Sequence, residues 1–196
     1  MLKDAATAHN LGFVILRFFN AAGADPQLRT GQSTPQAENL IKRAVQAAIG
    51  LRPRIEIYGT DHPTPDGTCI RDYIHVMDLV QAVSLALGYL RRQGEPVTLN
   101  AGYGQGASVH QIIETVERLS DAAIAVDRMA RREGESAAVV AEPRKLRETL
   151  GWRPQFDSLD LIVGSALEWE KRLASRRGNQ RDSLVARKAP SPPTYV

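Results

Sequence analysis

Two arginine-containing segments carry the residues best suited to bind a charged small molecule. Arg71 opens the segment 71–76, in which the later residues become apolar, and Arg132 belongs to the charged segment 131–135. A guanidinium offers a planar fork that bridges phosphate oxygens, so two such sites on one frame would suit a diphosphate. A structural arginine that binds loop carbonyls and a solvated run of charges are the alternative interpretations of the two segments.

A glycine-rich turn at residues 102–106 fits a dinucleotide-binding loop poorly. Its third glycine, Gly106, comes one residue too early for the G-x-G-x-x-G spacing, and no acidic residue ends a second strand about 20 positions later. We therefore interpret these glycines as a tight structural turn, which glycine permits because it lacks a Cβ.

Other reaction chemistries find little support in the residue pattern. The four histidines lie far apart, outside any H-E-x-x-H motif, and the single cysteine, Cys69, allows neither an internal disulfide nor a cysteine-rich metal cage. No G-x-S-x-G motif indicates a hydrolase. We assign no catalytic and no metal-binding residue.

The elements that must position these residues alternate between helices and strands. The predicted strands cover 13–19, 54–58, 69–75, 97–100 and 124–126. The predicted helices cover 2–10, 39–49, 77–90, 143–150 and 158–173, together with a helix that begins at a capping box of Ser108 and Gln111. This alternation predicts an α/β fold with a largely parallel sheet, in which the apolar run 13–19 is buried on both faces.

Length and composition indicate an ordinary globular protein. The chain has 196 residues, of which 43% are hydrophobic and 24% charged, values that exclude disorder throughout. Five basic residues and one acidic residue fall in 175–196, so residues 1–174 carry 20 basic and 21 acidic groups. The basic surplus therefore belongs to a proline-rich tail, 175–196, which we expect to be disordered, and it does not indicate a nucleic-acid partner.

The expected compartment is the cytoplasm, with no membrane partner. One cysteine is typical of an intracellular protein. The chain has no run of 18 apolar residues and no signal-peptide core after Met1.

Several segments together resemble a known family. Residues 16–24, 62–79, 100–102 and 131–135 resemble the C-terminal half of the UDP-glucose 4-epimerases, members of the extended short-chain dehydrogenase/reductase group, and the resemblance covers about residues 2–173. It implies the C-terminal part of a Rossmann-like parallel sheet plus the small α/β substrate-binding lobe. It also implies interconversion of UDP-glucose and UDP-galactose through a 4-keto intermediate with bound NAD.

The resemblance also implies a role for nine residues. Asn20, Asn39 and Leu40 would lie at the diphosphate, Tyr58 at the uracil, Arg71 and Arg132 as a diphosphate clamp, Glu135 at the ribose, Val139 at the hexose C2 substituent and Phe18 at the nicotinamide. Glu135 stands where the family often has an aspartate, and Phe18 stands where the family often has a tyrosine. Val139 leaves both plain and N-acetylated UDP-sugars open as substrates.

Other family motifs do not occur in the chain. It has no G-x-x-G-x-x-G after a first strand and no Tyr-x-x-x-Lys. We therefore expect residues 1–174 to be the UDP-sugar-binding portion of an NAD-dependent epimerase without its cofactor half, inactive alone and without the homodimer of the family. The alternative is a non-enzymatic UDP-sugar-binding module, or a subunit that complements a separate cofactor half.

Overall fold

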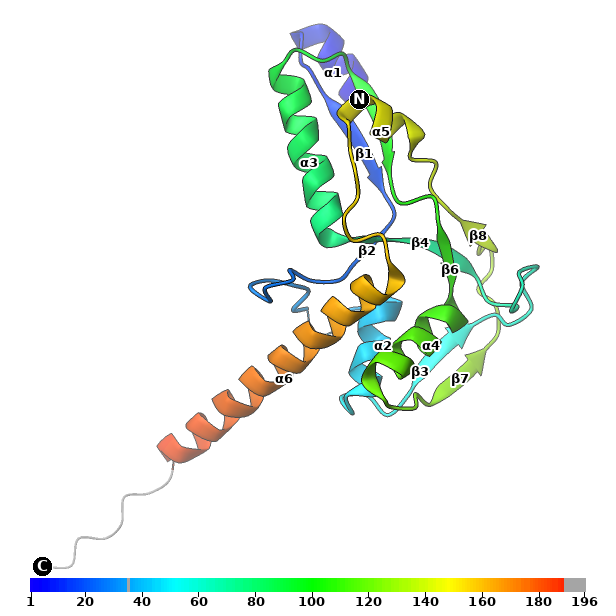
Figure 1. The fold of residues 1–196 in the computed structure, drawn as a ribbon, viewed down its shortest axis with the longest axis vertical. Helices are drawn as coiled ribbons and strands as arrows, with labels where there is room; N and C mark the ends of the chain where they lie inside the picture. The colour runs from blue at the N-terminus through cyan, green and yellow to red at the C-terminus, as the bar shows by residue number, and fades with distance from the viewer. Residues whose placement is uncertain (35, 189–196) are drawn as a thin grey trace, which may run out of the picture.

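The computed structural model describes residues 1–34 and 36–188, with side chains as far as 177. Figure 1 shows three groups of elements along the molecule, with α1, α3, α5 and β1 at one end, α2, α4, β3 and β7 at the other, and β2, β4, β6 and β8 between them. The strands pair mainly in parallel, so the α/β fold predicted from the sequence is confirmed.

The first group is built on a parallel pair of strands. β1 (Val14–Phe18) pairs with β5 (Val97–Ala101), and α3 (Val76–Arg91) packs against β1 while α5 (Arg144–Leu150) packs against β5. The prediction that β1 is buried on both faces is wrong, because its residues are half-buried or exposed. The described elements cover β1 only partly, although its apolar sequence would suit a strand covered on both faces.

The middle group connects the two ends of the molecule. β2 (Asn20–Ala22) runs parallel to β4 (Ile70–His75), which also pairs antiparallel with β6 (Gly106–Ser108) and parallel with β8 (Ala138–Val139). The glycine-rich segment before β6 forms a tight structural turn, as predicted. A Cβ on Gly102 would lie 2.6 Å from the Cβ of Ala141, so no larger residue fits there.

The third group carries the best-packed helices. β3 (Ile55–Tyr58) pairs in parallel with β7 (Val126–Met129), and α2 (Leu40–Ala48) and α4 (Val109–Ser120) pack on each other and on α6. The predicted capping box of α4 is confirmed, since the Gln111 amide donates to Ser108 Oγ at 3.1 Å and the Ser108 amide donates to Gln111 Oε1 at 2.9 Å. The strand predicted at 124–126 begins two residues later than expected.

The helices at the two ends of the chain differ in how well the sequence predicts them. α1 (Leu2–His9) ends at Asn10 in the left-handed conformation, as the stop signal predicts. α6 (Leu159–Lys188) does not end near Leu173 but continues to Lys188, so the predicted tail boundary at 174 falls inside a helix. Helix-forming Ala, Arg and Leu residues continue until the prolines beyond 189, which lie outside the described residues.

One hydrophobic core joins the three groups. Its largest fully buried side chains include Trp152, Ile74, Leu99, Ile112 and Leu146. In the part of the chain that the structure describes, no helix is both long and apolar enough to cross a bilayer.

Candidate functional site

Tyr58 and Arg132 meet because β3 and β7 are paired in register. Tyr58 ends β3 opposite Met129, the last residue of β7, so the loop after β7 passes over the tyrosine ring. The Cζ atom of Arg132 lies 3.9 Å from the ring centroid, which is a cation–π contact. This contact holds the Arg132 guanidinium at the carboxyl ends of two parallel strands.

Arg71 and Glu135 form the second half of the same site. Arg71 Nη2 lies 3.2 Å from Glu135 Oε1, with the two side chains 18% and 20% exposed. Arg71 Nη1 also donates to the carbonyl of Ile70 at 2.8 Å. In β4, Arg71 stands opposite Val139 of β8, so Val139 shares this surface. We call Tyr58, Arg71, Arg132, Glu135 and Val139 the arginine cluster.

Glu135 has unused hydrogen-bonding capacity. Its Oε2 atom is buried and has no hydrogen-bond partner, which is uncommon for a carboxylate oxygen. Cys69 Sγ lies 4.0 Å from the other oxygen, Oε1, and burial raises the pKa of that thiol, so it stays protonated at neutral pH. A ligand hydroxyl could donate to the unpaired oxygen.

Asn39 and Leu40 stand at the start of α2. Asn39 is the N-cap residue in an extended conformation, yet its side chain makes no cap hydrogen bond. The first N–H groups of any helix lack intrahelical acceptors, and together with the helix dipole they favour an anion. The start of α2 is therefore a second place where phosphate oxygens could be bound.

Asn20 and Phe18 lie outside the arginine cluster. Asn20 begins β2 opposite Tyr73, two residues beyond Arg71 on β4. Phe18 ends β1 and its side chain is 61% exposed. Among the described residues, no side-chain hydrogen bond joins Asn20, Phe18 or Asn39 to the cluster. The structure thus brings together five of the nine predicted residues directly.

The residues near Phe18 do not fit the phosphates of NAD. β1 is followed at once by β2, without a glycine-rich turn into a helix. The glycine turn after β5 leads into a strand, β6, and its amides at Tyr103 and Gly104 already donate to Asp72. The described residues therefore offer no cradle for a dinucleotide pyrophosphate.

Asp72 is a residue whose role the sequence did not reveal. It is fully buried, its Oδ1 accepts from the Tyr103 amide at 3.0 Å, and its Oδ2 accepts from the Gly104 and Ala141 amides at 2.9 and 3.1 Å. These bonds tie the glycine turn and the segment after Val139 to β4. The only local signal is a carboxylate that directly follows Arg71 near the start of β4.

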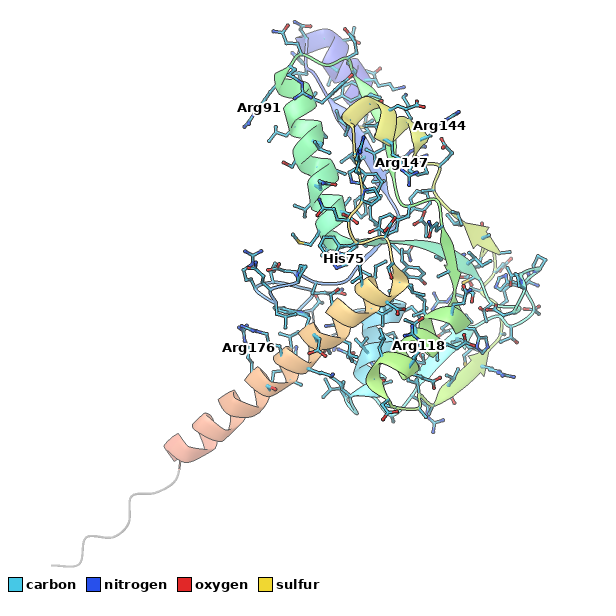
Figure 2. The ribbon with its side chains drawn as sticks, viewed as in Figure 1. His75, Arg91, Arg118, Arg144, Arg147 and Arg176 are labelled. Atoms are coloured by element: carbon cyan, nitrogen blue, oxygen red, sulfur yellow. The ribbon has the colours of Figure 1, made fainter. Side chains whose placement is uncertain are left out.

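His75 joins the middle group to the last helix. Figure 2 shows it where β4 passes into α3, beside the first turns of α6. Its Nδ1 accepts from the Met77 amide at 3.2 Å, its Nε2 lies 3.0 Å from Ser165 Oγ, and its ring stacks on Phe156. Its contacts are structural, and no group of metal-ligating side chains occurs within the described ranges.

Comparison with known proteins identifies a family and several relatives. The family model described as GDP-mannose 4,6 dehydratase matches residues 1–163. The chain is 53% identical over 178 residues to a UDP-glucose 4-epimerase of Azospirillum brasilense, covering 91% of this chain and 51% of that protein. It is 43% identical to the UDP-glucose 4-epimerase of Halalkalibacterium halodurans, covering 84% and 49%.

Solved structures agree with this comparison. The UDP-glucose 4-epimerase of Brucella ovis in complex with NAD is 42% identical, with a TM-score of 0.83 over 86% of this chain and 52% of that one. The enzyme of Bifidobacterium longum in complex with NAD⁺ and UDP is 32% identical, with a TM-score of 0.81 over 87% and 51%. The resemblance predicted from the motifs is confirmed, and the chain spans about half the length of the curated relatives it matches.

Proposed function

Because the chain belongs to the family described as GDP-mannose 4,6 dehydratase, we propose that its arginine cluster binds the UDP portion of UDP-glucose or UDP-galactose. In this proposal the chain is the substrate-binding portion of a UDP-glucose 4-epimerase. The observation that carries it is the convergence of two guanidinium groups, an aromatic ring and an incompletely paired carboxylate from separate segments.

Each group in the cluster suits one part of UDP. The Arg71 and Arg132 guanidinium groups would bind the diphosphate oxygens, and Tyr58 would lie at the uracil. Glu135 Oε2 would accept from a ribose hydroxyl, which would satisfy its unpaired oxygen. Val139, opposite Arg71, would border the hexose near C2.

Asn39, Leu40 and Asn20 would complete the phosphate site. The free N–H groups at the start of α2 would donate to phosphate oxygens, and Asn20 would reach the same groups from the start of β2.

The chain alone would not turn over its substrate. Inversion at C4 through a keto sugar requires a hydride acceptor, which NAD supplies in this chemistry. The described residues do not fit the NAD phosphates, and Phe18 is the one residue assigned to that cofactor. We therefore propose a role in binding and orienting the UDP-sugar.

Isothermal titration calorimetry with UDP tests the proposal. The wild-type chain should bind UDP, and Arg71→Ala should weaken binding by about 1–3 kcal/mol, as for other charged hydrogen bonds. Arg54→Ala is the matched control, because Arg54 lies at the opposite end of β3 in an exposed pair with Asp127. Equal affinities for all three proteins would contradict the assignment.

An activity assay tests the proposal that the chain alone does not turn over a UDP-sugar. Wild-type chain with added NAD should leave UDP-galactose unchanged, as followed by chromatography of the sugar nucleotides. Formation of UDP-glucose would show that the chain holds a complete catalytic site.

We propose as the second candidate a subunit that complements a separate cofactor half, on the evidence of the incompletely covered β1 strand. Mixing the chain with the unmatched half of the Azospirillum brasilense relative should then restore epimerase activity. No activity in a mixture that forms a stable complex would exclude this candidate.

A further inference from the structure

We propose that Gln32 is a positioning residue that orients the Asn39 side-chain amide toward the phosphates of the ligand. Gln32 Nε2 donates to Asn39 Oδ1 at 2.9 Å. With Oδ1 occupied by this donor, the Asn39 Nδ2 group is left to donate to an anionic oxygen. The inference rests on the proposed function, since it concerns how Asn39 meets the diphosphate.

Asn39 does not cap its own helix. An N-cap asparagine ordinarily accepts from the second or third amide of the helix through its side-chain oxygen. In α2 this cap bond is missing, and the oxygen accepts from Gln32. In this arrangement the Asn39 side-chain NH₂ group and the first N–H groups of α2 are available as donors.

Gln32 is itself held by a buried ion pair. Its carbonyl accepts from Lys42 Nζ at 2.9 Å and from Trp169 Nε1 at 3.1 Å. Lys42 Nζ lies 2.6 Å from Glu170 Oε2, and the two side chains are only 4% and 2% exposed. The other oxygen of Glu170 accepts from Gln46 at 2.9 Å.

These bonds fix the loop against two helices. A buried ammonium cannot leave its carboxylate partner without exposing an unpaired charge to the protein interior, so Lys42 is held in place. The Gln32 backbone is therefore fixed between α2 and α6, and its side chain is directed at Asn39. Gln32, Asn39, Lys42, Trp169 and Glu170 all line one cavity of about 390 Å³.

Calorimetry with UDP on a double-mutant cycle tests the inference. Gln32→Ala should weaken UDP binding about three- to tenfold, the range for one lost hydrogen bond. Asn39→Ala should lose a similar factor, and the double variant should bind no more weakly than Asn39→Ala, because Gln32 acts through Asn39. Gln36→Ala, an exposed glutamine in the same loop, should bind as the wild type does.

Two further measurements separate positioning from general loss of structure. Gln32→Leu, which keeps much of the side-chain volume but cannot donate, should weaken UDP binding as much as Gln32→Ala does. Uridine, which has no phosphate, should lose no affinity in any of the Gln32 variants.

The opposing results are distinct. Unchanged UDP affinity in Gln32→Ala, or a loss that persists in the Asn39→Ala background, would overturn the inference while a weakened Arg71→Ala variant still supported the proposed function. No UDP binding by the wild-type chain would remove the proposed function and this inference with it.

Discussion

At the scale of single residues, Asp72 determines the shape of the surface around Val139. Its carboxylate accepts three backbone amides from two segments in a fully buried position. In Asp72→Asn one oxygen becomes an NH₂ group, which cannot accept, so at least one amide loses its acceptor. We expect a loss of about 2–3 kcal/mol in the free energy of unfolding by urea.

Asp127→Asn is the control for this substitution. Asp127 forms an exposed ion pair with Arg54, with its side chain 40% exposed, so its loss should cost about 0–1 kcal/mol. A similar loss for both variants would show that the buried bonds of Asp72 contribute nothing special.

His75 gives the stability of the chain a pH dependence. Burial lowers its pKa below the ordinary value of 6.5, and its Nδ1 already accepts the Met77 amide. The unfolded state therefore binds a proton more readily, so this contribution to stability is complete above pH 6.5 and declines as the pH falls below it. Thermal midpoints measured from pH 7 to pH 5 should fall in the wild type.

The variant His75→Asn identifies the source of that decline. Asparagine can still accept the amide of Met77 as an N-cap but does not titrate. Its midpoint should change less than that of the wild type over the same pH interval. An equal decline in both proteins would assign the dependence to other groups.

At the scale of elements, the start of α4 depends on Ser108. This hydroxyl accepts from the Gln111 amide at 3.1 Å and donates to Asp66, so it joins the helix to the loop before β4. Ser108→Ala should lower the free energy of unfolding by about 1–2 kcal/mol, the usual cost of a lost cap. Ser120→Ala, at the other end of α4, removes only bonds to carbonyls of its own helix and should cost much less.

Local patterns predicted most elements, and long-range packing explains the misses. The alternation in β3 and the capping box of α4 are visible in a few consecutive residues, and both are confirmed. The exposure of β1 depends on which other elements cover it, and no local pattern contains that information. The extension of α6 follows from helix-forming residues that continue beyond the expected end.

In the candidate site, too, local sequence patterns indicate some residues, whereas others are brought together only by long-range contacts. Arg71 stands out because it opens a segment whose later residues become apolar, and Arg132 and Glu135 stand out because they lie in one short charged segment. Lys42 and Glu170 are 128 positions apart, so nothing in either neighbourhood predicts their ion pair. Gln32 lies in a polar loop where a glutamine is unremarkable by residue type.

At the scale of the whole molecule, pairing between separate strands assembles the site. The β3–β7 register places Arg132 over Tyr58, and the β4–β8 register places Val139 beside Arg71. Residues from four strands and their loops therefore form one surface, although Tyr58, Arg71 and the segment 132–139 are separate in the sequence. A register shift of one residue would turn Tyr58 to the opposite face of its strand.

The exposed face of α3 is the clearest feature of the molecular surface. Val80, Val83 and Leu87 follow helical spacing and are 54%, 54% and 50% exposed, so they form one apolar stripe. Contiguous apolar surface of this kind promotes association and binds hydrophobic dyes. Val83→Lys combined with Leu87→Lys should lower both anilinonaphthalene sulfonate fluorescence and concentration-dependent light scattering, while the thermal midpoint stays within a few degrees because lysine favours helix. Leu161→Lys, at an isolated exposed leucine of α6, is the control and should leave both signals near those of the wild type. Equal signals from the wild type, the double α3 variant and Leu161→Lys would mean that the α3 stripe is not the surface that associates.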